Sequence, residues 1–415
     1  MLDLRLIRAE PDLVRAALAR RGADGPLDEI LALDERRRAL LTEVEGLRAE
    51  QNQASEAIAA AKRAGEDADD AIARMREVAS RVKALQAELD EVQRALDERM
   101  ALLPNLPAED APPQDTVIKA VGEGGRAGRD HLELAGPLID MERGANVSGS
   151  RFAYLLGDLV FLELALVRFA LDRLADEGFQ PVVPPALVRE RALFGTGFLP
   201  DTEQQLYRLP DDDLYLIGTS EVPLASLHAD EILEPADLPR RYAGFSPCFR
   251  REAGAAGKDT RGIFRVHQFD KVEMFVFCDP EEARAEHDRL LAIEESILQA
   301  LELPYRVVNI AVGDLGASAA KKYDCEAWLP GQQRYRELTS CSNTTDFQAR
   351  RLDIRYRPEG GRPRHVATLN GTAAAVGRTI IALLENGQQE DGSVRLPEAL
   401  HRWGAPVVLP PASSG

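Results

Sequence analysis

The sequence predicts an α+β fold in which helices flank an antiparallel β-sheet and an N-terminal pair of helices forms a coiled-coil arm. Two observations lead to this prediction. Apolar residues recur at alternating steps of three and four over residues 27–64 and again over 72–96, which is typical of a coiled-coil seam. After residue 116, short runs rich in Val, Ile, Phe and Tyr are rarely separated by regular helices. An antiparallel sheet is therefore favoured over parallel βαβ units.

The N-terminal region begins with a short helical segment, residues 1–26, that ends near Gly22 and Pro26. Gly65-Glu66-Asp67 then divides the coiled-coil pattern into two helices of roughly 35 residues, or about 50 Å each. A short break between helices of similar length predicts an antiparallel hairpin, which is too thin to form a core and should project as an arm. Its predicted seam contains Ile30, Leu33, Leu40, Val44, Leu47, Ala54 and Ile58, followed by Ile72, Met75, Ala79, Val82, Leu85, Leu89, Val92 and Leu96.

Proline residues mark the next boundary, because Pro104 and Pro107 stop the second helix. Residues 1–103 are thus expected to form one domain, 104–115 a Pro-rich linker, 116–404 the mixed domain and 405–415 a disordered tail. Within the mixed domain, helices are expected over residues 159–176 and 371–386. Strands are expected in residues 178–185, 214–219, 241–250, 263–269, 271–278 and 305–310.

Composition narrows the class of protein. The net charge of −18 disfavours nucleic acid as a partner, although an acidic protein can carry one basic surface. No apolar run approaches the ~20 residues needed to span a membrane, and the first residues carry charges throughout. The four cysteines form no CxxC pair, which argues against structural zinc and against a disulfide framework. A cytoplasmic protein without a membrane partner is expected.

Residues 249–275 gather planar cations, an aromatic ring and a carboxylate in a predicted hairpin. Its first strand is Phe249-Arg250-Arg251-Glu252, its turn contains Gly254 to Gly257, and its second strand carries Arg265, His267, Phe269 and Glu273. Arginine binds phosphate bidentately, phenylalanine stacks on a base, and glutamate can bind an ammonium group. On residue types alone, a charged surface hairpin explains the segment equally well. His267 is interpreted as structural rather than catalytic.

Four further segments could carry chemistry, and each also has an ordinary structural explanation. Gly218-Thr219-Ser220-Glu221 could be a helix cap. Residues 336–343 (RELTSCSN) could be a polar strand edge, and residues 369–378 an apolar helix with one arginine. The string GFQPVVPP at residues 178–185 is too common to be specific.

Taken together, and in their order along the chain, the segments resemble class II aminoacyl-tRNA synthetases in the form seen in seryl-tRNA synthetases. Residues 178–185 resemble motif 1 of that class, 249–275 motif 2 and 369–378 motif 3. The resemblance extends from the helical arm to LPEAL near residue 400. It implies a class II synthetase-type antiparallel sheet and ATP-dependent attachment of L-serine to tRNA-Ser through seryl-adenylate, with tRNA-Sec as a further substrate where present. It also implies Mg²⁺ bound with ATP, no zinc, and a homodimer built by motif 1, whose proline is Pro185.

The resemblance also implies residue roles. Serine-binding roles fall on Thr219, Glu221, Arg250, Glu273, Asn370 and Thr372. ATP-binding roles fall on Arg250, Arg251, Glu252, Val266, Phe269, Glu337, Leu338, Thr339, Ser340 and Arg378. Of these, Arg250, Glu337 and Arg378 are expected to act in catalysis, and Glu337 and Ser340 supply hard oxygen ligands suited to Mg²⁺. Arm contacts with tRNA are expected from Arg36, Arg48, Arg74 and Arg81, although ion pairs on a solvated helix face explain these arginines as well.

Three other functions remain open on the sequence. A related ligase could load a carrier protein, but such relatives lack the long arm. A non-catalytic paralogue could act as a binding module, but Arg250, Glu252, Glu337 and Arg378 are intact. A coiled-coil scaffold would explain residues 27–100 only.

Overall fold

The computed structural model describes residues 1–65, 67–200, 205–253 and 261–412. Contacts divide the chain into two compact units. The first contains residues 2–19 and 23–104, and the second contains residues 1, 20–22 and 105–415.

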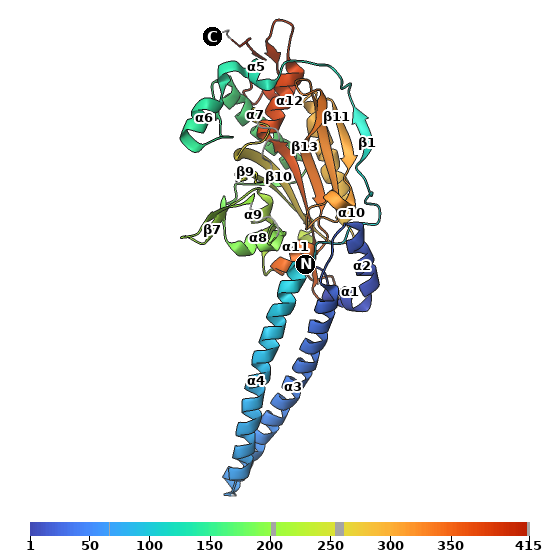
Figure 1. Ribbon diagram of the computed structural model, residues 1–415, viewed down its shortest axis with the longest axis vertical. Helices are drawn as coiled ribbons and strands as arrows, with labels where there is room; N and C mark the ends of the chain where they lie inside the picture. Colours follow the sequence, from blue (N-terminus) through green and yellow to red (C-terminus); the bar gives the residue numbers. More distant parts are fainter. Residues whose placement is uncertain (66, 201–204, 254–260, 413–415) are drawn as a thin grey trace. The chain divides into compact units, whose positions relative to one another are not determined.

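The N-terminal unit is helical, and the predicted coiled-coil hairpin is confirmed. After α1 (Leu4–Ala9) and α2 (Pro11–Arg20), α3 (Leu27–Ala64) and α4 (Asp69–Ala101) run side by side (Figure 1). They are antiparallel, since Arg99 pairs with Glu29 while Ser55 contacts Met75. Leu40 and Val44 are fully buried in the seam, and each such side chain contributes about 1.5–3 kcal/mol. Gly65 ends α3 in the left-handed conformation.

The second unit is built on an eight-stranded sheet (Figure 1). Every pair of neighbours is antiparallel except the edge pair β4–β9, which is parallel. In spatial order the strands are β1 (Thr116–Val121), β11 (Tyr305–Asn309), β12 (Lys321–Leu329), β13 (Arg334–Asn343), β16 (Ala367–Ala375), β10 (Gln268–Cys278), β9 (Arg240–Phe249) and β4 (Gln180–Val182).

One face of this sheet is apolar and forms the main core. Val272, Met274 and Val276 of β10 alternate with residues of the opposite face and pack in one cluster with three long helices. The helices are α7 (Asp158–Asp176), α10 (Ala283–Ala300) and α12 (Val376–Gly387). The other face carries polar side chains over β10, β12, β13 and β16, and this is the face that forms the site described below.

Short elements complete the unit. The helices are α5 (His131–Ala135), α6 (Met141–Ser148), α8 (Glu190–Thr196), α9 (Glu221–Ala225), α11 (Phe347–Leu352) and α13 (Glu398–His401). Two small sheets have two strands: β2 (Ile139–Asp140) with β3 (Tyr154–Leu155), and β17 (Val394–Arg395) with β18 (Val408–Leu409). Two have three strands. One contains β5 (Leu187–Val188), β7 (Leu214–Leu216) and β6 (Tyr207–Leu209), and the other contains β8 (Ile232–Leu233), β14 (Arg355–Tyr356) and β15 (Arg364–His365). None of the helices in the described residues is long and apolar enough to cross a membrane.

Three local predictions are wrong. Residues 371–375 belong to strand β16 and not to a helix, because their backbone pairs with β10 from Gly371 to Ala375 and Gly371 also pairs with β13. The hairpin strands are shorter at the turn than expected, since β9 ends at Phe249 and β10 begins at Gln268. The tail is not wholly disordered, because Val408 and Leu409 pair with β17 and Leu409 is buried.

Candidate active site

Two adjoining cavities open on the polar face of the sheet. The large cavity has a volume of about 500 Å³ and contains Thr219, Glu221, Glu273 and Asn370 in its wall. The small pocket, of about 90 Å³, contains Glu252, Val266, Phe269 and Arg378. The same five residues line both: Arg250, Lys271, Glu337, Ser340 and Thr372. This junction is where two ligands, one in each cavity, would meet.

Strand alternation brings much of the wall together. Phe269, Lys271 and Glu273 occupy every second position of β10 and therefore point to one face of the sheet. Glu273 lies directly opposite Thr372 of β16, so their side chains are neighbours on that face. A carboxylate and a hydroxyl are thus placed side by side at the junction of the cavities.

A β-bulge in β13 orients the side chains of Glu337 and Ser340. In β13, Thr339 pairs with Cys325 and Glu337 pairs with Glu326, which leaves Leu338 as an extra residue. Regular alternation would direct residues 337 and 340 to opposite faces, whereas one extra residue brings both to the same face. Glu337 and Ser340 consequently both line the junction.

Amide groups fix the buried carboxylate of Glu221. Its Oε1 accepts hydrogen bonds from Gln348 Nε2 at 2.7 Å and from Asn370 Nδ2 at 2.9 Å. Burial, aided by the nearby carboxylate of Glu273, raises the pKa of Glu221 to about 7. Helix α9 packs closely on β9, where a Cβ at Gly244 would lie 2.7 Å from Leu224 Cδ1.

Lys271 and Glu273 form a buried ion pair at the junction. Burial raises the pKa of Glu273, and Lys271 opposes this shift by stabilising the carboxylate. Glu273 and Glu221 therefore place two carboxyl groups in the large cavity next to a lysine ammonium group. Such a wall suits a small ligand that has an ammonium group and a hydroxyl group.

The small pocket combines an aromatic ring with guanidinium groups. The Arg250 guanidinium lies 5.3 Å from the centre of the Phe269 ring, and its Nε donates to the carbonyl of Gly218 at 3.1 Å. Glu252 accepts a hydrogen bond from Arg265 Nη1 at 2.6 Å. A flat heterocycle bearing phosphates would find stacking and charge partners here.

Arg378, in the first turn of α12, completes this pocket. Its Nη1 lies 3.5 Å from Glu337 Oε1 and donates to the Glu337 carbonyl at 3.0 Å. Burial opposes ionisation of Glu337, but Arg378, Lys322 and Arg250 outweigh it and keep its pKa below the ordinary value. Glu337 is therefore a carboxylate at neutral pH.

Two predicted site residues do not join this group. The Thr339 hydroxyl donates to Glu294 Oε2 at 2.8 Å on the apolar side of the sheet. Arg251 is exposed and is absent from the walls of both cavities, among the residues described. Its backbone NH donates to Gln205 instead. The predicted Gly-rich turn, residues 254–257, lies outside the described residues.

Sequence reasoning missed several residues of the site. Lys271 was detectable, since it stands two positions from both Phe269 and Glu273 in a predicted strand. Phe264, whose ring lies 3.8 Å from the Arg336 guanidinium and 4.6 Å from that of Arg378, had no signal in its local sequence. Gln348 comes from α11, far along the chain from the carboxylate that it binds.

The residues that could hold a metal ion are few. Among the described residues, no group of three or more His, Cys, Asp and Glu side chains is placed to bind one. Glu337 and Ser340 nevertheless fit Mg²⁺, because the bulge directs a charged carboxylate and a hydroxyl into the junction. Mg²⁺ commonly takes only one or two protein ligands and completes its shell with water and phosphate oxygens.

Comparisons with known proteins agree with this geometry. Residues 205–387 match the model of the class II tRNA synthetase core domain (G, H, P, S and T), and residues 1–107 match that of the seryl-tRNA synthetase N-terminal domain. The fold and the two cavities therefore define a class II aminoacyl-tRNA synthetase.

Individual relatives identify the family within this class. The chain is 52% identical to the serine--tRNA ligase of Thermobifida fusca, over 99% of each chain, and 52% identical to that of Streptomyces coelicolor, over the full length of both. A crystal structure of the Pyrococcus horikoshii seryl-tRNA synthetase complexed with ATP matches with a TM-score of 0.92 at 44% identity, covering 100% of both chains. The cytoplasmic serine-tRNA ligase of Naegleria fowleri in complex with AMP matches at 0.88 and 32%, covering 100% of this chain and 99% of that one. The chain belongs to the seryl-tRNA synthetase family.

Proposed function

We propose that this protein attaches L-serine to tRNA-Ser, and to tRNA-Sec where present, in an ATP-dependent reaction that proceeds through seryl-adenylate. The observation that carries the proposal is the junction of the two cavities, where Arg250 and Lys271 lie beside Glu337, Ser340 and Thr372. The names of the relatives and the nucleotides bound by the two related structures support the same reaction.

Serine would occupy the large cavity. Glu221 and Glu273 would bind its ammonium and hydroxyl groups, while Thr219 and Asn370 would help to orient it. Thr372 lies opposite Glu273 and would contact the serine hydroxyl. The serine carboxylate would then point toward the junction.

ATP would occupy the small pocket, with adenine beside Phe269 and its amino group near Glu252. Val266 and Leu338 also line this pocket, while Arg251 and Thr339 are expected to contribute only from outside its wall. The serine carboxylate attacks the α-phosphate, pyrophosphate leaves, and a ribose hydroxyl of the tRNA then attacks the acyl carbon. Arg250 would stabilise charge on the α-phosphate, and Arg378 would neutralise the pyrophosphate.

Magnesium would be held by Glu337 and Ser340. When bound, it would supply positive charge to the phosphate oxygens that these two residues face. The protein's own contribution is to keep Glu337 ionised through Arg378, at 3.5 Å.

Thr372→Val tests the hydroxyl contact. Valine keeps the shape of threonine but cannot pair with the serine hydroxyl, so the KM for serine is expected to rise about 10- to 100-fold. The KM for ATP should change less than twofold. Steady-state pyrophosphate exchange measures both, and equal increases in the two constants would contradict the assignment.

The pKa of Glu221 predicts a pH dependence. Because burial raises this pKa to about 7, the carboxyl group is largely neutral at pH 6 and cannot pair with an ammonium ion. Serine affinity should therefore increase as the pH rises, and the KM for serine should fall roughly tenfold between pH 6 and pH 8. Glu221→Gln should bind serine weakly and show a flat profile; a variant that keeps the slope would exclude Glu221 as its source.

The N-terminal residues 1–103 are assigned to tRNA binding, 104–115 to the linker and 116–404 to catalysis. Arg36 and Arg81 pair with Glu88 and Glu43, and Arg48 donates to Gln86 at 2.9 Å, so phosphate groups would have to compete for these side chains. Arg74 is exposed on α4.

A homodimer in the cytoplasm is part of the proposal. Exposed apolar side chains support the dimer: Phe161 and Leu164 on α7 are each 57% exposed, and Val183, beside β4 in the predicted motif 1, is 81% exposed. The four free cysteines suit a reducing compartment.

Serine-dependent exchange of ³²P-pyrophosphate into ATP tests the function directly. The proposal predicts exchange with serine, and transfer of serine to tRNA-Ser when the tRNA is added. Absence of exchange would favour a non-catalytic paralogue or a scaffold. Exchange without tRNA charging would favour a carrier-protein ligase.

A further inference from the structure

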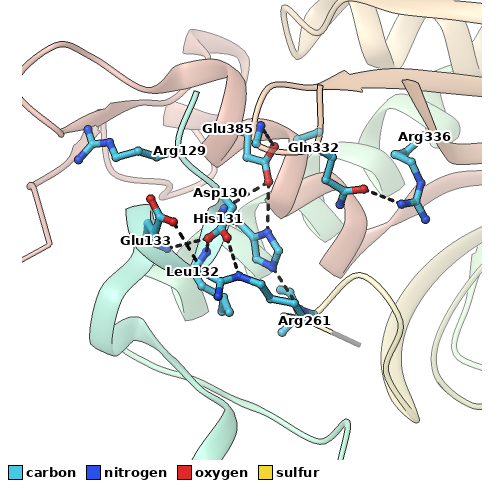
Figure 2. Close-up of polar contacts among 12 residues, drawn as sticks. Arg129, Asp130, His131, Leu132, Glu133, Arg261, Gln332, Arg336 and Glu385 are labelled. Atoms are coloured by element: carbon cyan, nitrogen blue, oxygen red, sulfur yellow. Dashed lines mark hydrogen bonds and ion pairs between the residues drawn. The ribbon is translucent and has the colours of Figure 1, made fainter. Parts of the chain in front are cut away.

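A cluster of buried polar groups lies next to the small pocket (Figure 2). It borders a separate cavity of about 380 Å³ that shares Phe264 with that pocket. His131 begins α5, Glu385 lies near the end of α12, and Gly331 lies between β12 and β13. Residue 131 falls outside both matched family models, which cover residues 1–107 and 205–387.

Glu385 is fully buried, and three donors satisfy its carboxylate. Its Oε1 accepts from the His131 backbone NH and lies 3.2 Å from His131 Nδ1, and its Oε2 accepts from the Gly331 NH at 2.8 Å. A buried carboxylate without such partners would be strongly unfavourable. The carboxylate therefore ties α5 and the β12–β13 turn to α12.

These contacts also select the tautomer of His131. Nδ1 faces a carboxylate oxygen and must be the nitrogen that carries the proton. Nε2 is then free to accept, and it receives the backbone NH of Ile263 at 3.3 Å. A single neutral imidazole thus connects the Glu385 carboxylate to the backbone of a segment that lines the small pocket.

The segment passes very close to the ring. A Cβ at Gly262, whose φ is +72°, would lie 2.0 Å from His131 Nε2, so only glycine fits there. A second link lies one residue earlier, where Arg261 Nε donates to Asp130 Oδ2 at 2.7 Å. Asp130 also caps α5 through its Oδ1.

The residue after Ile263 is Phe264, which contacts Arg378 of the small pocket and also Arg336. Its ring lies 3.8 Å from the Arg336 guanidinium and 4.6 Å from that of Arg378. Cation–π contacts of this kind depend on where the ring lies. A displacement of Ile263 would therefore change the position of Arg378, the cation assigned to the phosphates of ATP.

We propose that the Nε2 acceptor of His131, whose ring is oriented by Glu385, is a positioning device for the nucleotide pocket. Through the backbone of Ile263 it fixes Phe264, and through Phe264 it aligns Arg378 with the phosphates of ATP. This inference rests on the proposed use of the small pocket for ATP, but not on serine as the amino acid.

Paired variants test the proposal, with ATP affinity measured by calorimetry in the absence of serine. His131→Asn can still donate to Glu385 but loses the acceptor for Ile263, and it is expected to raise the Kd for ATP about tenfold. His131→Gln places an oxygen near the position of Nε2 and should stay within threefold of the parent. In pyrophosphate exchange, the KM for serine should change less than twofold in both variants.

His228→Asn is the matched control, because His228 is a similarly buried histidine that bonds Tyr242 and Glu231 and lines none of the three cavities described here. An equal rise in ATP Kd in this control, or equal effects of His131→Asn and His131→Gln, would overturn the proposal. If His131→Asn does not fold, Asp130→Asn provides a second test. It keeps the α5 cap and removes only the negative charge that pairs with Arg261. It should weaken ATP binding about fivefold, and a change within the threefold range allowed for His131→Gln would overturn the proposal. A parent protein that binds ATP but lacks serine-dependent exchange would refute the proposed function alone.

Discussion

Arg250→Ala is expected to lower the kcat of serine-dependent pyrophosphate exchange by about 10²–10³-fold. Arg250 lines both cavities, so its guanidinium is placed where the α-phosphate gains charge in the transition state. Losing one preorganised donor to such charge typically costs this much. The KM for serine should rise by a smaller factor, because the amide-bound Glu221 remains in place.

Two further variants make this result interpretable. Arg250→Lys keeps the charge but not the planar pair of donors, and it should recover only part of the lost rate. Arg240→Ala removes an arginine from the opposite end of β9, where Arg240 pairs with Asp237, and should leave the rate unchanged. A full rate in Arg250→Ala would remove Arg250 from the mechanism.

Deletion of residues 30–100 is expected to abolish tRNA charging while pyrophosphate exchange continues within about threefold of the parent. All residues assigned to serine and ATP lie in the unit that contains residues 105–415, so adenylate formation does not need the coiled coil. Transfer to tRNA does need it if the arm supplies the RNA contacts. Both activities can be measured on one preparation, with filter-bound seryl-tRNA as the second readout.

A milder variant separates RNA contact from a general effect of truncation. Replacing Arg36, Arg48, Arg74 and Arg81 by alanine retains the helices and removes four positive charges. It should raise the KM for tRNA about tenfold at low salt and flatten its dependence on salt, because fewer phosphate groups are neutralised. Normal charging by the deletion variant would show that the arm is dispensable.

The sequence predicted correctly those features that depend on residues close together in the chain. The seam of α3 and α4 follows from spacing alone, because each buried position of a coiled coil recurs at a fixed interval. Segments around Arg250, Glu221 and Glu337 were also found as motifs, since the functional side chains of each lie within a few consecutive residues. The resemblance to a known family then supplied roles that residue types alone could not.

Elsewhere, tertiary pairing decided the outcome. Residues 371–375 carry alanines that favour a helix in isolation, yet their backbone pairs with β10, and Gly371 also pairs with β13. Thr339 and Ser340 are equivalent in sequence, but the extra residue Leu338 determines which hydroxyl faces the cavities. Phe264 and Gln348 reach the site only because segments that are distant in the sequence pack together there. Such contacts cannot be predicted from a single sequence.

The central position of β10, β13 and β16 in the sheet has a consequence for motion. Each of these strands has a hydrogen-bonded neighbour on both sides, so its amide protons should exchange only when much of the unit unfolds. Lys271, which pairs with Ser246 on one side and Ala375 on the other, is therefore in a part of the wall that stays fixed on the timescale of turnover. Opening and closing around substrates should arise in segments outside these three strands.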